Sequence, residues 1–157
     1  MLVFPKTASF SHLTAARLHG LPLSYAMEAD ERLHVVRPIT QSRIRRADVV
    51  GHRACHPRSI TSVDGLPVVD LADTWVDLGE LVARGKPVGL DDLIGVGDAI
   101  ATRLHGILLR RDALARRVRP HGKATLLEAL EEIRPRRPPG TTACAASRAR
   151  WGWRSPA

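Results

Sequence analysis

The stretch from residue 64 to residue 82 constrains the fold of this chain most, because it reads as a turn, a strand and a helix in succession. An Asp-Gly pair, Asp64–Gly65, separates two short apolar runs, which is the pattern of a two-residue β-hairpin turn. We therefore expect paired strands at residues 60–63 and 66–69. Pro67 has no N–H to give to a neighbouring strand, which predicts that the second strand lies at a sheet edge.

A helix is expected to follow over residues 72–82. Asp70 fits the N-cap, and Asp73 places a carboxylate in the first turn, where the helix dipole favours it. One apolar face recurs at helical spacing and comprises Leu71, Trp75, Leu78 and Val82. Asp70, Asp73 and Asp77 would also line one side of this helix as paired carboxylates, but capping and first-turn electrostatics account for two of them without catalysis.

Shorter patterns predict the remaining elements. A first helix is expected over residues 10–18, with Ser9 or Ser11 as its cap and Gly20 and Pro22 as its end. Further strands are expected at 33–36 and 49–53, and further helices at 90–102, 112–118 and 123–133. Strands that come first and helices that follow predict an α+β fold: a small, mostly antiparallel sheet of about four short strands, then about four helices.

The composition is that of one globular domain, which we place at residues 1–135. The chain has 157 residues, of which 44% are hydrophobic and 25% charged. No apolar run reaches the length of about 18 residues that a transmembrane helix needs, and the first ten residues do not resemble a signal peptide. The two cysteines, Cys55 and Cys144, lie far apart in sequence, as in a reduced protein. We therefore expect a cytoplasmic protein with no membrane association.

The net charge of +8 is concentrated near the C-terminus. No acidic residue follows Glu132, whereas six arginines do. Residues 136–157 also lack periodicity and any aliphatic residue larger than alanine, so we expect a disordered basic tail. The body of the chain is close to neutral, which weakens a nucleic-acid interpretation based on total charge.

Two arginine groups in the body are candidate phosphate contacts, and a solvated surface is the alternative for both. Arg43, Arg45 and Arg46 lie in a polar connector. The second group surrounds the expected helix at 112–118 and contains Arg110, Arg111, Arg116 and Arg117. The aromatic content of 4% provides little for base stacking.

The segment His52-Arg-Ala-Cys55-His56 offers three metal-binding side chains within five residues. No paired cysteines or second histidine pair accompanies them, so surface histidines at a strand end are the simpler interpretation. Phosphate-binding loops, dinucleotide fingerprints, zinc-protease motifs and nucleophile elbows are absent from the sequence. The residues therefore predict no catalytic group, no metal and no cofactor.

Four segments together carry a family resemblance: Ser-His-Leu-Thr-Ala-Ala-Arg-Leu-His-Gly-Leu-Pro-Leu at 11–23, Asp-Glu-Arg-Leu-His-Val-Val at 30–36, Val-Val-Gly-His-Arg at 49–53, and residues 64–78. This series resembles the N-terminal region of actinobacterial proteins related to AbiEi-type antitoxins. Many of those proteins continue into a nuclease-like domain similar to Vsr endonucleases. The resemblance covers about residues 9–135. It implies an α+β domain associated with toxin–antitoxin, phage-defence or DNA-related systems, and it supplies no catalytic residues.

The chain departs from that family in two respects. It begins almost at the first motif, without the winged-helix DNA-binding domain that full AbiEi-type antitoxins carry. Its tail has no carboxylate after Glu132, so the metal-dependent nuclease of the longer relatives cannot be built from it. The Arg-, Ala-, Pro-, Gly- and Trp-rich tail looks like GC-rich coding DNA read in a wrong frame, which suggests a truncated remnant of a nuclease-bearing ancestor.

The expectation that follows is a non-enzymatic antitoxin-like or regulatory domain that binds a toxin protein. The alternative is a truncated Vsr-like endonuclease-family protein that keeps nonspecific DNA binding through Arg110, Arg111, Arg116, Arg117 and the tail. A third reading is a decayed gene product without a selected activity. The sequence indicates no oligomeric state.

Overall fold

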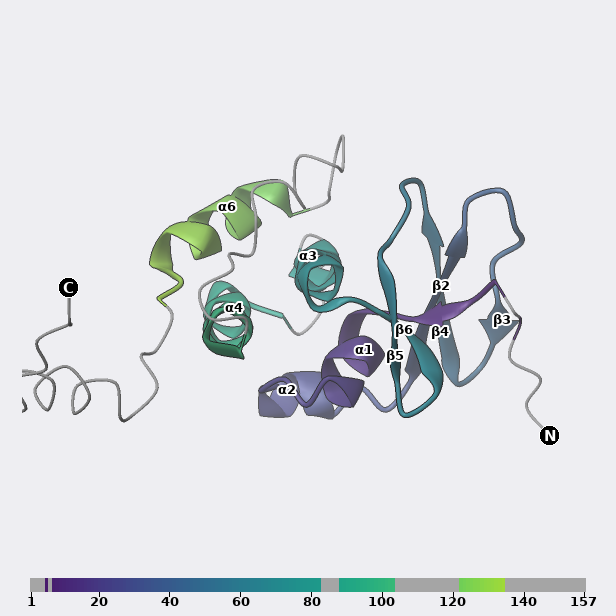
Figure 1. Ribbon diagram of the computed structural model, residues 1–157, viewed down its shortest axis with the longest axis horizontal. Coiled ribbons are helices and arrows are strands. Elements are labelled where there is room, and N and C mark those ends of the chain that lie inside the picture. The colour runs from purple at the N-terminus through teal and green to yellow at the C-terminus, as the bar shows by residue number, and fades with distance from the viewer. Residues whose placement is uncertain (1–4, 6, 83–87, 104–121, 135–157) are drawn as a thin grey trace, which may run out of the picture.

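The computed structural model describes residues 5, 7–82, 88–103 and 122–134, and it has an α+β fold. Figure 1 shows the strands gathered at one end of the molecule and the helices stacked beside them. The strands are β1 (Ser9–Phe10), β2 (Leu33–Pro38), β3 (Arg45–Arg46), β4 (Val49–Ala54), β5 (Ile60–Val63) and β6 (Leu66–Val69). The helices are α1 (His12–Leu18), α2 (Tyr25–Glu28), α3 (Leu71–Val82), α4 (Leu90–Arg103) and α6 (Lys123–Glu132).

The sheet is mixed, which corrects the prediction of four mostly antiparallel strands. Its six described strands lie in the order β3-β4-β2-β1-β6-β5. Strand β2 runs parallel to β4, and β1 runs parallel to β6, while the other three pairs are antiparallel. The difference arises because β1, only two residues long, lies between β2 and β6 and joins the two halves of the sheet. A strand of two residues is too short to show an alternation of apolar and polar residues in the sequence.

The hairpin at residues 60–69 is confirmed. Asp64 and Gly65 have φ values of 50° and 77°, as the mirror-image hairpin turn requires, and Val63 pairs with Leu66. The edge position predicted from Pro67 is wrong, because β6 lies between β5 and β1. Pro67 faces Ser62 one step beyond the turn-closing pair, which is a non-hydrogen-bonded position, so its missing N–H costs no bond to β5.

The first helix starts two residues later than predicted. Residues 9–10 pair with β2, and α1 begins at His12 after Ser11, whose backbone N–H donates to the carbonyl oxygen of His34 (3.0 Å). His12 itself has a φ of 49°, in the left-handed region. The chain therefore changes from strand to helix within a single residue, and this sharp turn directs the His12 side chain into the protein interior.

The helices enclose an apolar core next to the sheet. Trp75 is 1% exposed, and its Nε1 donates to the carbonyl oxygen of Leu93 in α4 (2.9 Å). Helices α3 and α6 approach closely at Gly79, where a Cβ would come within 2.5 Å of the Leu126 side chain. The buried cluster also contains Leu13, Ala16, Leu21, Met27, Val76, Leu78, Leu81, Val88, Val96, Ile100 and Ala129.

The carboxylates of α3 have structural partners. Asp70 caps the helix, since its Oδ1 accepts the backbone N–H of Asp73 (2.7 Å). Asp73 Oδ2 accepts the backbone N–H of Ser59 (2.8 Å), and Asp77 Oδ1 accepts Nε of Arg58 (3.1 Å). These bonds tie the start of α3 to the loop before β5. The structure therefore favours the capping interpretation for Asp70.

Two predicted segments lie outside the described residues: the helix at 112–118 and the tail at 136–157. The domain boundary predicted after residue 135 falls there too. Among the helices that the structure describes, none is long and apolar enough to span a membrane.

Candidate functional site

Three histidines meet in the interior between the sheet and the helices. His12 comes from the start of α1, His34 from β2 and His52 from β4, and they are 1%, 2% and 6% exposed. Each offers a ring nitrogen that lies within 4.8 Å of the others. The rings of His12 and His52 are stacked with centroids 3.6 Å apart, and His34 lies 5.1 Å from His52 and 5.7 Å from His12. We refer to these residues as the histidine cluster.

Sheet register places two of these histidines together. Strand β2 pairs in parallel with β4 so that Val36 faces His52. Since side chains alternate along a strand, His34 and Val36 share a face, and His34 and His52 therefore project from the same side of the sheet. Strand β2 is held to α1 by the backbone N–H of His34, which donates to Thr14 Oγ1 (2.8 Å).

Ring nitrogens of the cluster face one another on the inside. His34 Nδ1 lies 3.1 Å from His52 Nε2, so one of these two atoms carries the shared hydrogen. His12 Nδ1 lies 3.0 Å from Ser11 Oγ. We call His12 Nε2 and His34 Nε2 the outer nitrogens; both are buried and make no hydrogen bond to any residue in the part of the chain that the structure describes.

Carboxylates stand behind these outer nitrogens. Glu80 Oε2 lies 3.8 Å from His12 Nε2, and Asp30 Oδ2 lies 3.6 Å from His34 Nε2. Asp77 Oδ2 is 4.0 Å from His12 Nδ1. His12 and His34 thus have three acidic side chains within ion-pairing distance.

Arginines close both ends of this line of ionisable groups. Arg58, 7% exposed, binds Asp77 Oδ1 through Nη2 (3.1 Å) and Glu80 Oε1 through Nη2 (3.5 Å). At the other end, Arg32 forms a two-pronged contact with Asp30 at 2.8 and 2.7 Å. The charged and imidazole groups therefore form a continuous series, which begins at Arg32 and ends at Arg58.

The surroundings determine the protonation of His34 and Asp30. Burial, reinforced by the nearby His12, lowers the pKa of His34 to about 4, although Asp30 opposes the shift. His34 is therefore neutral at pH 7 and presents a lone pair. The hydrogen bonds from Arg32 hold the pKa of Asp30 well below its usual range, so Asp30 remains a carboxylate.

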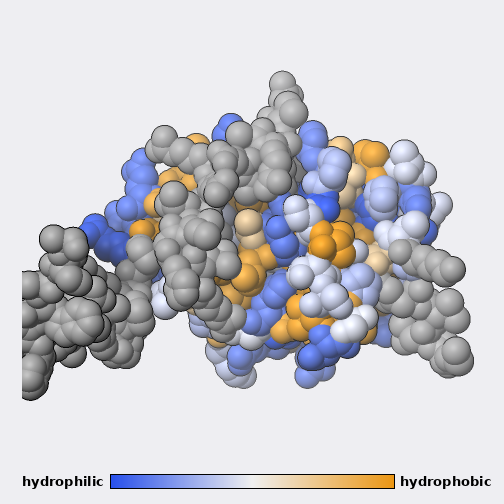
Figure 2. Space-filling model, in the orientation of Figure 1, coloured by the Kyte–Doolittle hydropathy of each residue, from blue (hydrophilic) through white to orange (hydrophobic). Residues whose placement is uncertain are grey.

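A pocket of about 400 Å³ opens beside Arg58, where β2 and β4 end. Its wall includes Arg37, His56 and Arg58 and no acidic residue among those that the structure describes. Ile39 and Ile60 stand at it 43% and 49% exposed. In Figure 2, hydrophobic and hydrophilic residues are interspersed over the sheet end of the molecule. The remaining wall residues are Thr7, Ser9, Val36, Pro38, Thr40, Ala54, Cys55 and Pro57.

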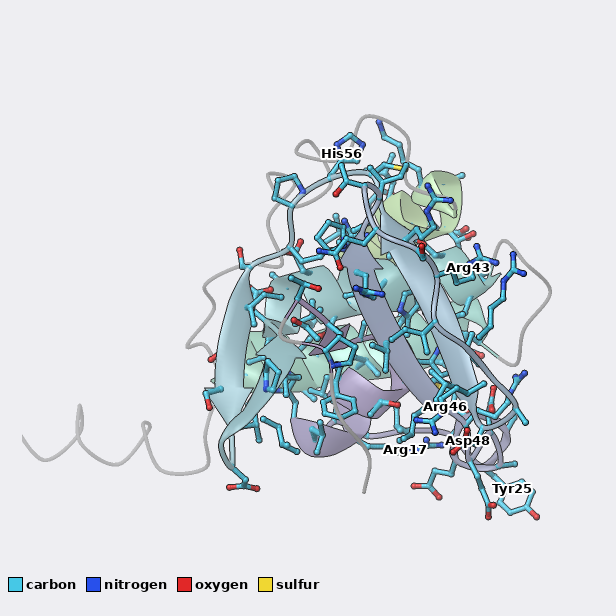
Figure 3. All side chains as sticks on the ribbon, turned by 90° about the vertical axis from the view of Figure 1, so that its right-hand side faces the viewer. Arg17, Tyr25, Arg43, Arg46, Asp48 and His56 are labelled. Atoms are coloured by element: carbon cyan, nitrogen blue, oxygen red, sulfur yellow. The ribbon has the colours of Figure 1, made fainter. Side chains whose placement is uncertain are left out.

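The predicted phosphate contacts fall into two groups. Arg43, Arg45 and Arg46 are exposed, and the latter two form β3, opposite Val50 and Val49. Figure 3 shows Arg43 and Arg46 on the same side of the sheet, with His56 at its end. The other four residues, Arg110, Arg111, Arg116 and Arg117, lie outside the described residues.

The local metal group considered in the sequence is divided by the fold. His52 is buried, whereas Cys55 is exposed and His56 is half-buried in the pocket wall. His52 instead lies with His12 and His34, a grouping that the sequence analysis did not predict. The only available signal was the occurrence of histidines within or beside otherwise apolar segments.

Comparison of the chain with family models, with curated proteins and with solved structures finds no match. The residues themselves therefore carry the functional argument.

Proposed function

We propose that this chain is a non-enzymatic, antitoxin-like or regulatory domain of a toxin–antitoxin or phage-defence system, acting in the cytoplasm by binding a partner protein at the pocket beside Arg58. The observation that carries the proposal is the combination of apolar and basic groups in one open pocket. Such a pocket suits a partner that offers an apolar side chain next to a carboxylate.

Ile39 and Ile60 supply exposed apolar surface at the pocket. Both are large side chains that are nearly half exposed at the wall of the pocket. Burying apolar surface contributes roughly 25 cal/mol per Å², and well-packed central anchors carry most of the affinity of an interface. An inserted partner side chain would remove both isoleucines from water.

Arg37 supplies a positive charge in the wall of the pocket. Its Nη1 donates to the carbonyl oxygen of Ser42 (3.0 Å), and its Nη2 contacts Gln41, so the guanidinium is held in place by neutral groups. Arg37 forms no ion pair with any acidic residue that the structure describes. Arg58, by contrast, is already neutralised by Asp77 and Glu80. Arg37 is therefore the cation left to attract an acidic partner.

The test is growth of cells that express a nucleotidyltransferase-type toxin encoded beside the gene of this chain. Co-expression of the chain should restore growth, and purified toxin should bind it. Arg37→Glu and Ile60→Asp should each weaken binding at least tenfold. Arg45→Glu makes the same charge change on exposed β3 and should leave the complex intact. Absence of such a toxin gene, or unaltered binding by Arg37→Glu, would reject the proposal.

A second candidate function, DNA binding by a Vsr-like endonuclease-family protein, is favoured by a different observation. From Arg37 to Arg58, both included, the sequence contains six arginines and one acidic residue, Asp48. Three of these arginines, Arg43, Arg45 and Arg46, are exposed together. Arginine side chains that contact phosphates release counterions and make affinity strongly dependent on salt.

DNA titrations at two salt concentrations separate the two functions. The full chain is compared with a chain that ends at residue 135 and with Arg45→Glu/Arg46→Glu. DNA binding by the folded body predicts a steep salt dependence that survives the truncation and is reduced by the double substitution. If binding disappears with the tail, the tail was acting as a nonspecific polycation and the second function is rejected.

A further inference from the structure

The histidine cluster has no part in the pocket-binding function proposed above, yet it is the most unusual chemical feature of the interior. We propose that His12, His34 and His52 bind one divalent transition-metal ion of the zinc type. Neutral imidazoles are common ligands of such ions, and three of them leave a fourth coordination position open.

The inner ring nitrogens are the proposed ligands. His34 Nδ1 and His52 Nε2 are 3.1 Å apart, close to the separation that two nitrogens have when each lies about 2.1 Å from a shared zinc ion. His12 contributes through Nδ1, the nitrogen next to Ser11 Oγ. The three ligand nitrogens lie within 4.8 Å of one another, which is farther apart than the nitrogens of an occupied zinc site. The side chains must therefore move closer together when the ion binds.

The outer nitrogens have the surroundings that metal-bound histidines usually have. A ligating imidazole commonly donates its other N–H to a carboxylate, which fixes the ring and increases its basicity. Here Glu80 stands behind His12 Nε2 at 3.8 Å, and Asp30 stands behind His34 Nε2 at 3.6 Å. Neither nitrogen has a hydrogen bond to the described residues. Movement of the rings toward an ion would also let each nitrogen donate a hydrogen bond to its carboxylate.

The charge around the cluster favours a cation. Three carboxylates, Asp30, Asp77 and Glu80, lie within 4.0 Å of a nitrogen of His12 or His34. Two guanidinium groups, Arg32 and Arg58, pair with them. These five side chains, of which Arg32 is 44% exposed, carry three negative and two positive charges. The group therefore has one excess negative charge, which favours binding of a divalent cation among the imidazoles.

The backbone of His12 is strained in a way that serves the cluster. A non-glycine residue at a φ of 49° is uncommon, and such strain persists where the surrounding structure requires the side chain at that place. Here it places His12 against His52. Two imidazoles that share one ion approach it from different directions, so binding must turn His12 out of its parallel stack on His52.

The test uses the untagged full chain, treated with chelator and titrated with Co²⁺ and then Zn²⁺. We expect one Co²⁺ per chain, intense visible d–d absorption typical of four-coordinate cobalt, and loss of these bands on addition of one equivalent of Zn²⁺. Zinc should also raise the unfolding temperature. In NMR spectra, the imidazole signals of His12, His34 and His52 should shift and those of the remaining histidines should not.

Matched variants locate the site. His34→Gln and His52→Gln should each lower the Co²⁺ affinity at least 100-fold, and Glu80→Gln should lower it about tenfold because the supporting carboxylate is lost. Cys55→Ser/His56→Gln removes the neighbouring surface ligands and should leave affinity unchanged.

Absence of the cobalt bands from the folded wild-type chain, or unchanged affinity in His52→Gln, would overturn the proposal. Loss of binding in Cys55→Ser/His56→Gln would instead assign the ion to the local segment and overturn it as well. If His34→Gln or His52→Gln fails to fold, Glu80→Gln decides: an unchanged affinity there rejects the site.

Discussion

The imidazole rings of His12 and His52 lie face to face, with centroids 3.6 Å apart and planes 16° from parallel. One residue starts α1 and the other belongs to β4, so the contact joins the helical part of the molecule to the sheet. His34 adds a third ring at 5.1 Å from His52. This buried polar contact makes stability depend on protonation and on the charged groups around it.

Lowering the pH should destabilise the protein already at pH values above those at which ordinary carboxylates titrate. The pKa of His34 is about 4 in the folded protein and 6.5 in the unfolded chain, so between these values the unfolded state binds more protons. The free energy of unfolding should therefore fall by about 2 to 3 kcal/mol as pH decreases from 7.5 to 4.5, measured by urea denaturation in chelator. Below about pH 4, protonation of Asp30 adds a further loss in the same direction.

His34→Gln is the control for this pH dependence. Glutamine cannot titrate in this range, so the slope of stability against pH between 7.5 and 4.5 should become shallower. An unchanged slope would assign the acid sensitivity to other groups.

Two glycines on neighbouring helices should respond to alanine in opposite directions. Gly79→Ala in α3 should destabilise by about 1 to 3 kcal/mol, because its Cβ would come within 2.5 Å of Leu126 in the well-packed core. Gly95→Ala in α4 should stabilise by about 0.5 to 1 kcal/mol, since Gly95 is exposed and its Cβ would meet nothing within 4 Å. Thermal and urea denaturation measure both, and a stable Gly79→Ala would contradict the close approach of α3 and α6.

Removal of one partner from the buried Arg58–Asp77 pair should be costly. Asp77 is fully buried and Arg58 is 7% exposed, so Asp77→Asn or Arg58→Met leaves a charge without its main partner and should cost about 3 kcal/mol. The double variant should cost less than the sum of the two. Strict additivity in this cycle would show that the two side chains do not interact in solution.

The start of α3 should depend on the Asp70 side chain. Asp70→Ala removes the acceptor of the Asp73 backbone N–H and should destabilise by about 1 kcal/mol in urea denaturation. Asp70→Asn keeps an oxygen acceptor and should cost less. Equal losses for the two substitutions would mean that charge, rather than capping, stabilises this end.

The elements that the sequence predicted correctly are those that short-range chemistry controls. The Asp64–Gly65 turn specifies the β5–β6 hairpin because both residues tolerate positive φ. The cap at Asp70 and the spacing of Trp75 and Leu78 specify α3. Errors appeared where partners are distant: β1 was assigned to a helix, β3 to a connector, and α2 was missed.

The same difference between local and distant partners applies to the candidate site residues. The exposure of Arg43, Arg45 and Arg46 follows from their polar surroundings in sequence. His52 was considered as a ligand, but its expected neighbours, Cys55 and His56, were the wrong ones. Sequence distance was a poor guide because consecutive strand residues project to opposite faces and the chain then leaves the strand.

The sequence by itself determined the hairpin, helix α3 and a globular α+β body, because turn preferences, capping and apolar periodicity act within a few residues. Only the tertiary structure decided the mixed strand order and the meeting of His12, His34 and His52. That meeting requires the parallel register of β2 and β4 and the left-handed turn at His12 at the same time. Both are set by packing among segments far apart in the chain, which no local pattern encodes.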